Sequence, residues 1–147
     1  MATASNPAVA SISRANNATI CLINQVRRQH GLHALHVSHR LSRAARRHSR
    51  SMVAHRYFEH GDYLGRIRQT GYFNGAHSWS AAENIAWGSG RYATPMSIFR
   101  LWMNSSGHRA NILNPRFREV GIGIHRGAPQ AGAGAAATYT TDFGAKH

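Results

Sequence analysis

The stretch AENIAWGSGRYATPMSIFRLWMNSSGHRANILNP, residues 82–115, decides the fold of this chain. It opens with an acid, Glu83, set among apolar residues. The pair Thr94-Pro95 indicates a helix start, because threonine caps a first turn and proline suits the first helical position. A strongly apolar run follows as far as Trp102, and a Ser-Ser-Gly turn then leads to His108. The stretch therefore predicts a buried helix between an acid and a histidine.

The segments around this stretch carry helix signals first and strand signals last. Apolar residues at helical spacing predict three helices before it, and Ser38 is a good cap for the second. Residues 72–82 have the composition of a loop, and Asn84–Trp87 reads as a short buried strand with Glu83 at its start. In the last third of the chain, two segments of alternating polarity joined by one loop predict a β-hairpin. The expected helices span 16–29, 39–57 and 62–69, and the expected hairpin strands span 120–124 and 137–143.

This order of elements predicts an α+β fold in a single domain. A chain of 147 residues buries roughly two-thirds of its unfolded surface, which is enough for a core. We expect residues 1–15 to form a flexible N-terminal arm and residues 16–147 to form the domain. The chain contains no run of about 18 apolar residues, so no transmembrane helix is expected.

The N-terminal sequence and the cysteine content bear on the compartment. The first residues lack a basic segment followed by an apolar one, so they are not an intact signal peptide. A mature secreted chain and a cytoplasmic protein both fit this beginning. Cys21 is the only cysteine, which rules out an intramolecular disulfide. Because Cys21 lies in an apolar helical pattern, we expect a buried, inert thiol.

The charge is the most unusual bulk property of the chain. Eighteen basic residues face five acids, which gives a formal net charge of +13. Such a surface favours anionic partners, either an anionic polymer or a membrane surface. Arg40, Arg43, Arg47 and Arg50 form one stripe on the predicted second helix. A solvated helix face is the simpler interpretation of this stripe, and no recognised nucleic-acid motif is present, so specific nucleic-acid recognition is not expected. We expect a monomer.

Histidines recur at every third position from His30 to His39. This spacing is typical of a metal-binding tract. The alternative, which the sequence favours, is a surface connection whose apolar residues Leu32, Leu35 and Val37 pack inward.

An ordered set of short motifs resembles the CAP superfamily, also called SCP-like, which comprises cysteine-rich secretory proteins, antigen 5 and plant pathogenesis-related proteins. The similarity is greatest to the short bacterial branch. Each motif alone is weak, but the ordered set spans nearly everything after residue 16. The motifs are Asn24–Arg27, His48–Met52, Tyr57–His60, Glu83–Ala86, Trp102–Arg109, Asn111–Pro115, Val120–Gly123 and Tyr139–Gly144.

The resemblance implies an α–β–α sandwich with a small, mainly antiparallel sheet between helices, in a secreted, extracellular protein. It also implies a central cleft with two histidines and two glutamates. Carried over by motif, His60 and His108 match the two histidines, and Glu83 matches the first glutamate. Ser105 stands where many members carry the second glutamate, so the tetrad is incomplete in this chain.

Three interpretations of these cleft residues remain open: a hydrogen-bonded structural network, binding of a metal or small ligand, and catalysis. Two imidazoles and a carboxylate suit a divalent metal, zinc above all, so His60, Glu83 and His108 are the predicted metal ligands. Glu83 has two alternative roles, which are to orient a histidine from outside the ligand set or to act as the base of a metal-dependent hydrolase of peptide or cell-wall material. The missing second acid favours binding over catalysis. Trp79, in a polar loop, is predicted to contact the ligand, which by analogy with the family is small and hydrophobic or lipid-like.

Overall fold

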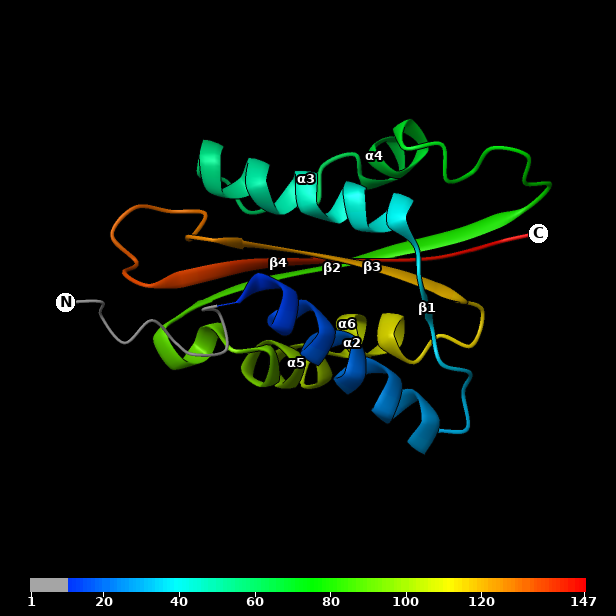
Figure 1. Cartoon of the computed structure of the whole chain (residues 1–147), viewed down its shortest axis with the longest axis horizontal. Helices are drawn as coiled ribbons and strands as arrows, with labels where there is room; N and C mark the ends of the chain where they lie inside the picture. Colours follow the sequence, from blue (N-terminus) through cyan, green and yellow to red (C-terminus); the bar gives the residue numbers. More distant parts are fainter. Residues whose placement is uncertain (1–10) are drawn as a thin grey trace.

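The computed structural model describes residues 11–147, which form three layers (Figure 1). A four-stranded sheet lies in the middle, with two helices on one face and three on the other. The first face carries α3 (His39–His55) and α4 (Tyr63–Gln69). The second face carries α2 (Ile12–Gln29), α5 (Pro95–Met103) and α6 (Ser106–Ile112). The predicted α–β–α sandwich is confirmed.

The sheet has the strand order β1-β3-β4-β2. Strand β4 pairs with both β2 and β3 in antiparallel orientation, whereas β1 runs parallel to β3. The sheet is therefore mainly antiparallel, as expected, and β2 forms one of its edges. A short 3₁₀ helix, η1, leads from β2 to α5. The bounds are β1 (His36–Val37), β2 (Trp79–Ser89), η1 (Gly90–Ala93), β3 (Glu119–Arg126) and β4 (Ala136–Lys146).

Side-chain caps set the starts of the helices. The side chains of Ser38, Asp62 and Thr94 each accept a hydrogen bond from the first turn of α3, α4 and α5. This mechanism satisfies backbone N–H groups that have no partner within the helix. Ser11 does the same for α2, which begins at Ile12 rather than near residue 16. The first helix therefore begins four residues before the predicted start at residue 16, and residues 1–10 of the predicted arm lie outside the described residues.

Strand β2 is longer than the sequence pattern predicts. It pairs with β4 over its whole length, from Trp79 opposite Lys146 to Ser89 opposite Ala136. The predicted loop at residues 72–82 and the short strand at residues 84–87 are corrected accordingly, and Glu83 lies in the middle of a strand. The small side chains of residues 80–82 give no alternating pattern, so the partner strand decides their conformation.

The core fills both sides of the sheet. On the side of α2, α5 and α6 it centres on the fully buried Trp102, whose indole packs edge-on against Tyr139. On the other side α3 lies very close to β3, because an added Cβ at Gly121 would stand only 2.0 Å from the Ser42 nitrogen. Glycine in β3 therefore allows this close packing of helix on strand.

Two predictions about burial are wrong. Cys21 is exposed, and it lines an open apolar pocket between α2 and the start of α5. Val37 is 53% exposed, because its short strand pairs with β3 while its side chain points to solvent, whereas Leu35 is buried as expected. No helix within residues 11–147 is both long enough and apolar enough to cross a membrane.

Candidate functional site

His60 and Glu83 meet as predicted. Glu83 projects from the middle of β2 with a fully buried side chain, and His60 lies on the connection between α3 and α4 with a side chain that is 46% exposed. The Nδ1 atom of His60 and the Oε1 atom of Glu83 are 2.9 Å apart. An ionised carboxylate only accepts hydrogen bonds, so Nδ1 carries the proton and donates it. Glu83 thereby fixes the tautomer of the His60 ring.

Arg66 from α4 holds the same carboxylate. Its Nη2 atom donates to both oxygens of Glu83, at 2.9 and 2.8 Å. A charge-assisted contact of this kind is stronger than a neutral hydrogen bond and orients the carboxylate. Burial alone would raise the pKa of Glu83, but hydrogen bonds and the Arg66 charge together lower it below its usual value. Glu83 is therefore a fixed anion in the wall of the site.

His48 from α3 lies beneath this pair. Its Nε2 atom donates to the carbonyl oxygen of Glu59 at 2.8 Å and lies 3.8 Å from the Glu83 carboxylate. Burial lowers the pKa of His48, although the Glu83 charge opposes this. The ring is therefore neutral near pH 7 and serves as a buried support rather than as a charged partner.

Asp142 on β4 is a second buried acid of the site. Its side chain is fully buried, and no N–H group within residues 11–147 donates to either carboxyl oxygen. Burial raises the pKa of Asp142, and the negative charge of Glu83 raises it further. Asp142 therefore retains its proton more readily than an exposed aspartate does.

His108 reaches the site from the opposite face of the sheet. It lies in the first turn of α6, where its Nδ1 atom is 2.9 Å from the hydroxyl of Ser105 and its carbonyl accepts a hydrogen bond from Asn84. Burial is the main cause that lowers the pKa of His108. His60 and His108 thus belong to different helical layers, on either side of the edge strand β2. Ser105, at the position where the resemblance implies a second glutamate in many members, thus contacts a histidine.

The imidazoles of His60 and His108 are the side chains here that could act as metal ligands. No group of three or more His, Cys, Asp or Glu residues within positions 11–147 is arranged to hold a metal ion. Glu83, predicted as a third ligand, has both oxygens engaged by Arg66. Its position fits the alternative role of orienting His60, since metal-binding histidines commonly donate their other ring nitrogen to a carboxylate.

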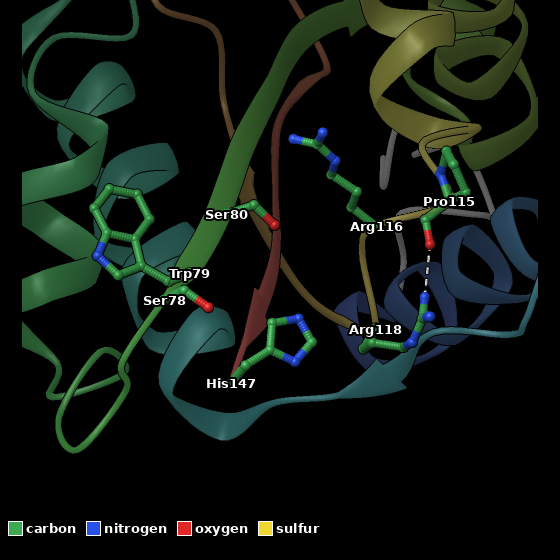
Figure 2. A pocket seen from close by; sticks show the side chains of 7 residues that line it. All are labelled: Ser78, Trp79, Ser80, Pro115, Arg116, Arg118 and His147. Atoms are coloured by element: carbon green, nitrogen blue, oxygen red, sulfur yellow. Dashed lines mark hydrogen bonds between the residues drawn. The ribbon is translucent and has the colours of Figure 1, made fainter.

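Trp79 lies apart from the two histidines, at the start of β2 rather than in a loop. Its indole is 40% exposed and stacks on Phe73, with ring centroids 4.2 Å apart. Figure 2 shows the indole on the side of β2 away from Arg116. A separate apolar pocket of about 400 Å³ lies between α2 and α5, beside Cys21 and Met96. The lipid-like ligand stays a prediction.

The sequence missed Arg66, His48 and Asp142 as parts of one site. Arg66 lies in a short helix that carries more than one arginine, and nothing in its local pattern marks it. Asp142 had a usable signal, because it is an acid inside a strand whose other residues from 136 to 145 are all buried. An ionisable group in such a strand indicates either a partner or a shifted pKa.

The predicted basic stripe lies on the outer face of α3. Arg43, Arg47 and Arg50 are exposed, and Arg40 donates a hydrogen bond to the carbonyl of Gly71. The two fully or nearly buried acids, Glu83 and Asp142, cannot offset these charges at the surface.

Comparison with known proteins gives consistent matches over most of the chain. Residues 21–141 match the sequence model of the cysteine-rich secretory protein family, CAP. The uncharacterized protein YkwD of Bacillus subtilis is 36% identical over 118 residues, which cover 79% of this chain and 44% of that protein. This chain therefore spans less than half the length of that relative.

Solved structures agree with these matches. An extracellular protein with an SCP domain from Bacillus anthracis superposes with a TM-score of 0.70 at 27% identity, over 88% of this chain and 41% of that chain. An outer surface protein of Borrelia burgdorferi superposes with a TM-score of 0.71 over 89% of this chain and 92% of that chain. At 16% identity, the second likeness concerns the fold alone.

Proposed function

The chain belongs to the cysteine-rich secretory protein (CAP) family, and we propose that its His60 and His108 together bind a divalent metal ion, zinc in the first place. Each imidazole would offer the lone pair of its Nε2 atom. Imidazole nitrogen is a preferred ligand of zinc, and water or a small ligand would complete the coordination. The site would thus be an open one at the edge of the sheet.

The observation that carries this proposal is the matched engagement of the two Nδ1 atoms. His60 uses Nδ1 toward Glu83 and His108 uses Nδ1 toward Ser105, both at 2.9 Å. Such contacts fix the ring orientation and direct the other nitrogen outward. Within residues 11–147, no hydrogen bond occupies the Nε2 atom of either ring.

The electrostatics of the site support the same function. A metal ligand must be deprotonated, and burial lowers the pKa of His108 so that its ring is neutral near pH 7. The fixed negative charge of Glu83 lies one hydrogen bond behind His60 and makes that ring a better donor to a cation. Neutral Asp142 adds no second charge that Arg66 would have to balance.

The same geometry supports binding rather than hydrolysis. A bound zinc ion would supply a Lewis acid at this place. A general base, however, needs a pKa near the working pH and an oxygen free to accept a proton. Glu83 has a lowered pKa and both oxygens bonded to Arg66, so it orients His60 and does not act as the base. We further propose an extracellular location, in line with the extracellular relative from Bacillus anthracis.

Isothermal titration calorimetry with zinc tests the proposal. His60→Ala/His108→Ala should weaken zinc binding by at least about tenfold, because removal of ligands costs more than loss of their partners. The matched control is His36→Ala/His39→Ala. It removes two exposed imidazoles from the histidine series at residues 30–39 and should leave the affinity for zinc unchanged. Equal zinc affinity in wild type and His60→Ala/His108→Ala, with loss in the control pair, would assign the metal to residues 30–39 instead.

A second candidate function is attachment to an anionic polymer or membrane surface through α3. It is favoured by the exposed Arg43, Arg47 and Arg50 on a chain of net charge +13. Binding of polyglutamate should fall steeply with salt, as expected for exposed charges. Arg43→Gln/Arg47→Gln should weaken it more than Arg100→Gln/Arg109→Gln, which removes the same charge from α5 and α6. Salt-independent binding would reject this function.

A further inference from the structure

A pocket of about 460 Å³ lies at the start of β2, and neither His60 nor His108 lines it. The side chains of two arginines, two serines and a histidine line it, and none of the seven lining side chains is acidic. Figure 2 shows the Arg116 guanidinium on the same side of β2 as the side chains of Ser78, Ser80 and His147. The lining residues are Ser78, Trp79, Ser80, Pro115, Arg116, Arg118 and His147.

The geometry points to a binding site for a phosphate-bearing ligand in this pocket, with Arg116 as its principal contact. The guanidinium of Arg116 makes no hydrogen bond with any residue from 11 to 147. It therefore offers five N–H donors in a fixed plane, a pattern that matches the oxygens of a phosphate group. Ser78 and Ser80 have short side chains that line the same pocket as Arg116, and their hydroxyl groups add further hydrogen-bond donors.

The backbone around the two arginines is held in place before any ligand arrives. Arg118 donates from Nη1 to the carbonyl oxygens of Pro115 and Phe117, at 2.6 and 3.1 Å. The backbone N–H of Arg116 donates to the side chain of Asn114 at 2.9 Å. The fully buried Arg27 binds the carbonyls of Asn114 and Phe117 from below. Such pre-organisation lowers the entropic cost of binding, so this loop differs from an ordinary solvated arginine pair.

The opposite wall is equally fixed. The carbonyl of His147 accepts hydrogen bonds from the backbone of His77 and Ser78, at 2.7 and 3.3 Å, and its N–H donates to Ser78. These bonds continue the pairing of β2 and β4 past Lys146 and hold Ser78 beside His147. The volume of the pocket is larger than one phosphate group. The phosphate of the ligand would therefore be part of a larger molecule, either a small molecule or a phosphate polymer.

Calorimetry at low salt tests this site with three probes: inorganic phosphate, glycerol phosphate and long-chain polyphosphate. Arg116→Gln should weaken glycerol phosphate binding about tenfold, the size expected for one charge-assisted contact. Arg109→Gln removes the same charge from the exposed face of α6 and should change the affinity less than about twofold. Ser80→Ala leaves the net charge unchanged and should still weaken binding.

The outcomes separate the site from general attraction to a cationic chain. Arg116-dependent binding of glycerol phosphate supports a small phosphate monoester as the ligand. Arg116-dependent binding of polyphosphate alone supports a polymer as its source. Equal weakening in Arg116→Gln and Arg109→Gln, or no binding of any probe, overturns the proposal. Zinc calorimetry on Arg116→Gln should match wild type, because His60 and His108 are not part of this pocket.

Discussion

Glu83 and Asp142 lie directly opposite each other on neighbouring antiparallel strands, both with buried side chains. Two carboxylates so placed cannot both ionise at low cost, because like charges in a poorly hydrated place disfavour each other. Arg66 binds only one of them, Glu83. The pair therefore divides its roles, with the charge on Glu83 and the proton on Asp142.

The first prediction concerns Asp142→Asn and the pH dependence of stability. The pKa of Asp142 is raised in the folded protein, so the native state retains a proton that the unfolded chain releases above about pH 4. Stability is therefore lost as pH rises from that value toward the raised pKa, by at most about 1.4 kcal/mol per pH unit. The amide that replaces the carboxyl group does not titrate. Urea unfolding at several pH values should show a smaller loss of stability on alkalinisation in Asp142→Asn than in the wild type, and equal losses would contradict the prediction.

The second prediction concerns Arg66→Met. This change removes the cation that balances Glu83 and leaves a buried negative charge without its partner. The expected loss of unfolding free energy is about 3 kcal/mol. Arg66→Met/Glu83→Gln removes both charges and should recover most of that loss. Chemical denaturation of the three variants checks this, and an unchanged stability in Arg66→Met would show that Glu83 has another source of compensation.

The third prediction concerns the close approach of α3 to β3. An added methyl group at Gly121 would meet the Ser42 nitrogen at 2.0 Å and the Leu41 carbonyl carbon at 2.2 Å, and backbone atoms cannot rotate away. Gly121→Ala should therefore cost about 2–3 kcal/mol of unfolding free energy. Gly107→Ala in α6 meets no atom within 4 Å and should be neutral or stabilising. Thermal melts compare the two, and equal melting temperatures would contradict the predicted close contact.

The fourth prediction concerns Arg27, a fully buried arginine of α2. It donates to the backbone carbonyls of His33, Ile112, Asn114 and Phe117, at distances between 2.9 and 3.3 Å. Arg27→Met leaves these carbonyls without a donor and should cost about 3 kcal/mol or more. Hydrogen exchange should quicken first in residues 112–118. Uniform quickening over the whole chain would instead indicate a general loss of stability.

The sequence predicted most helix starts, because caps are local. Ser38 and Thr94 act on the backbone three residues ahead of them, and that relation is visible in the chain. The start of α2 was missed although it follows the same rule, since Ser11 stands among other small polar residues. The hairpin of β3 and β4 was predicted because alternation is also a local pattern.

The remaining features depend on contacts between distant segments. Residues 79–82 form a strand because β4 supplies the partner, and their own side chains carry no strand signal. Glu83, His60 and His108 were found through family motifs, whereas their separations in the chain gave no ligand rule. Arg66 joins them only through the packing of α4, which no pattern in its segment encodes, whereas Asp142 is marked in the sequence only as an acid within a strand.

The outer edge of β2 has a consequence for how the protein behaves among copies of itself. An exposed edge strand offers free carbonyl and N–H groups to which a strand of another molecule can bind, and this is a common route to aggregation. Here the side chains of Asn111 and Trp102 donate to the carbonyl oxygens of Glu83 and Ile85, at 3.4 and 3.2 Å. Asn111 and Trp102, which belong to the helical layer, thus occupy carbonyl groups in the middle of β2 that a strand of another molecule would otherwise bind.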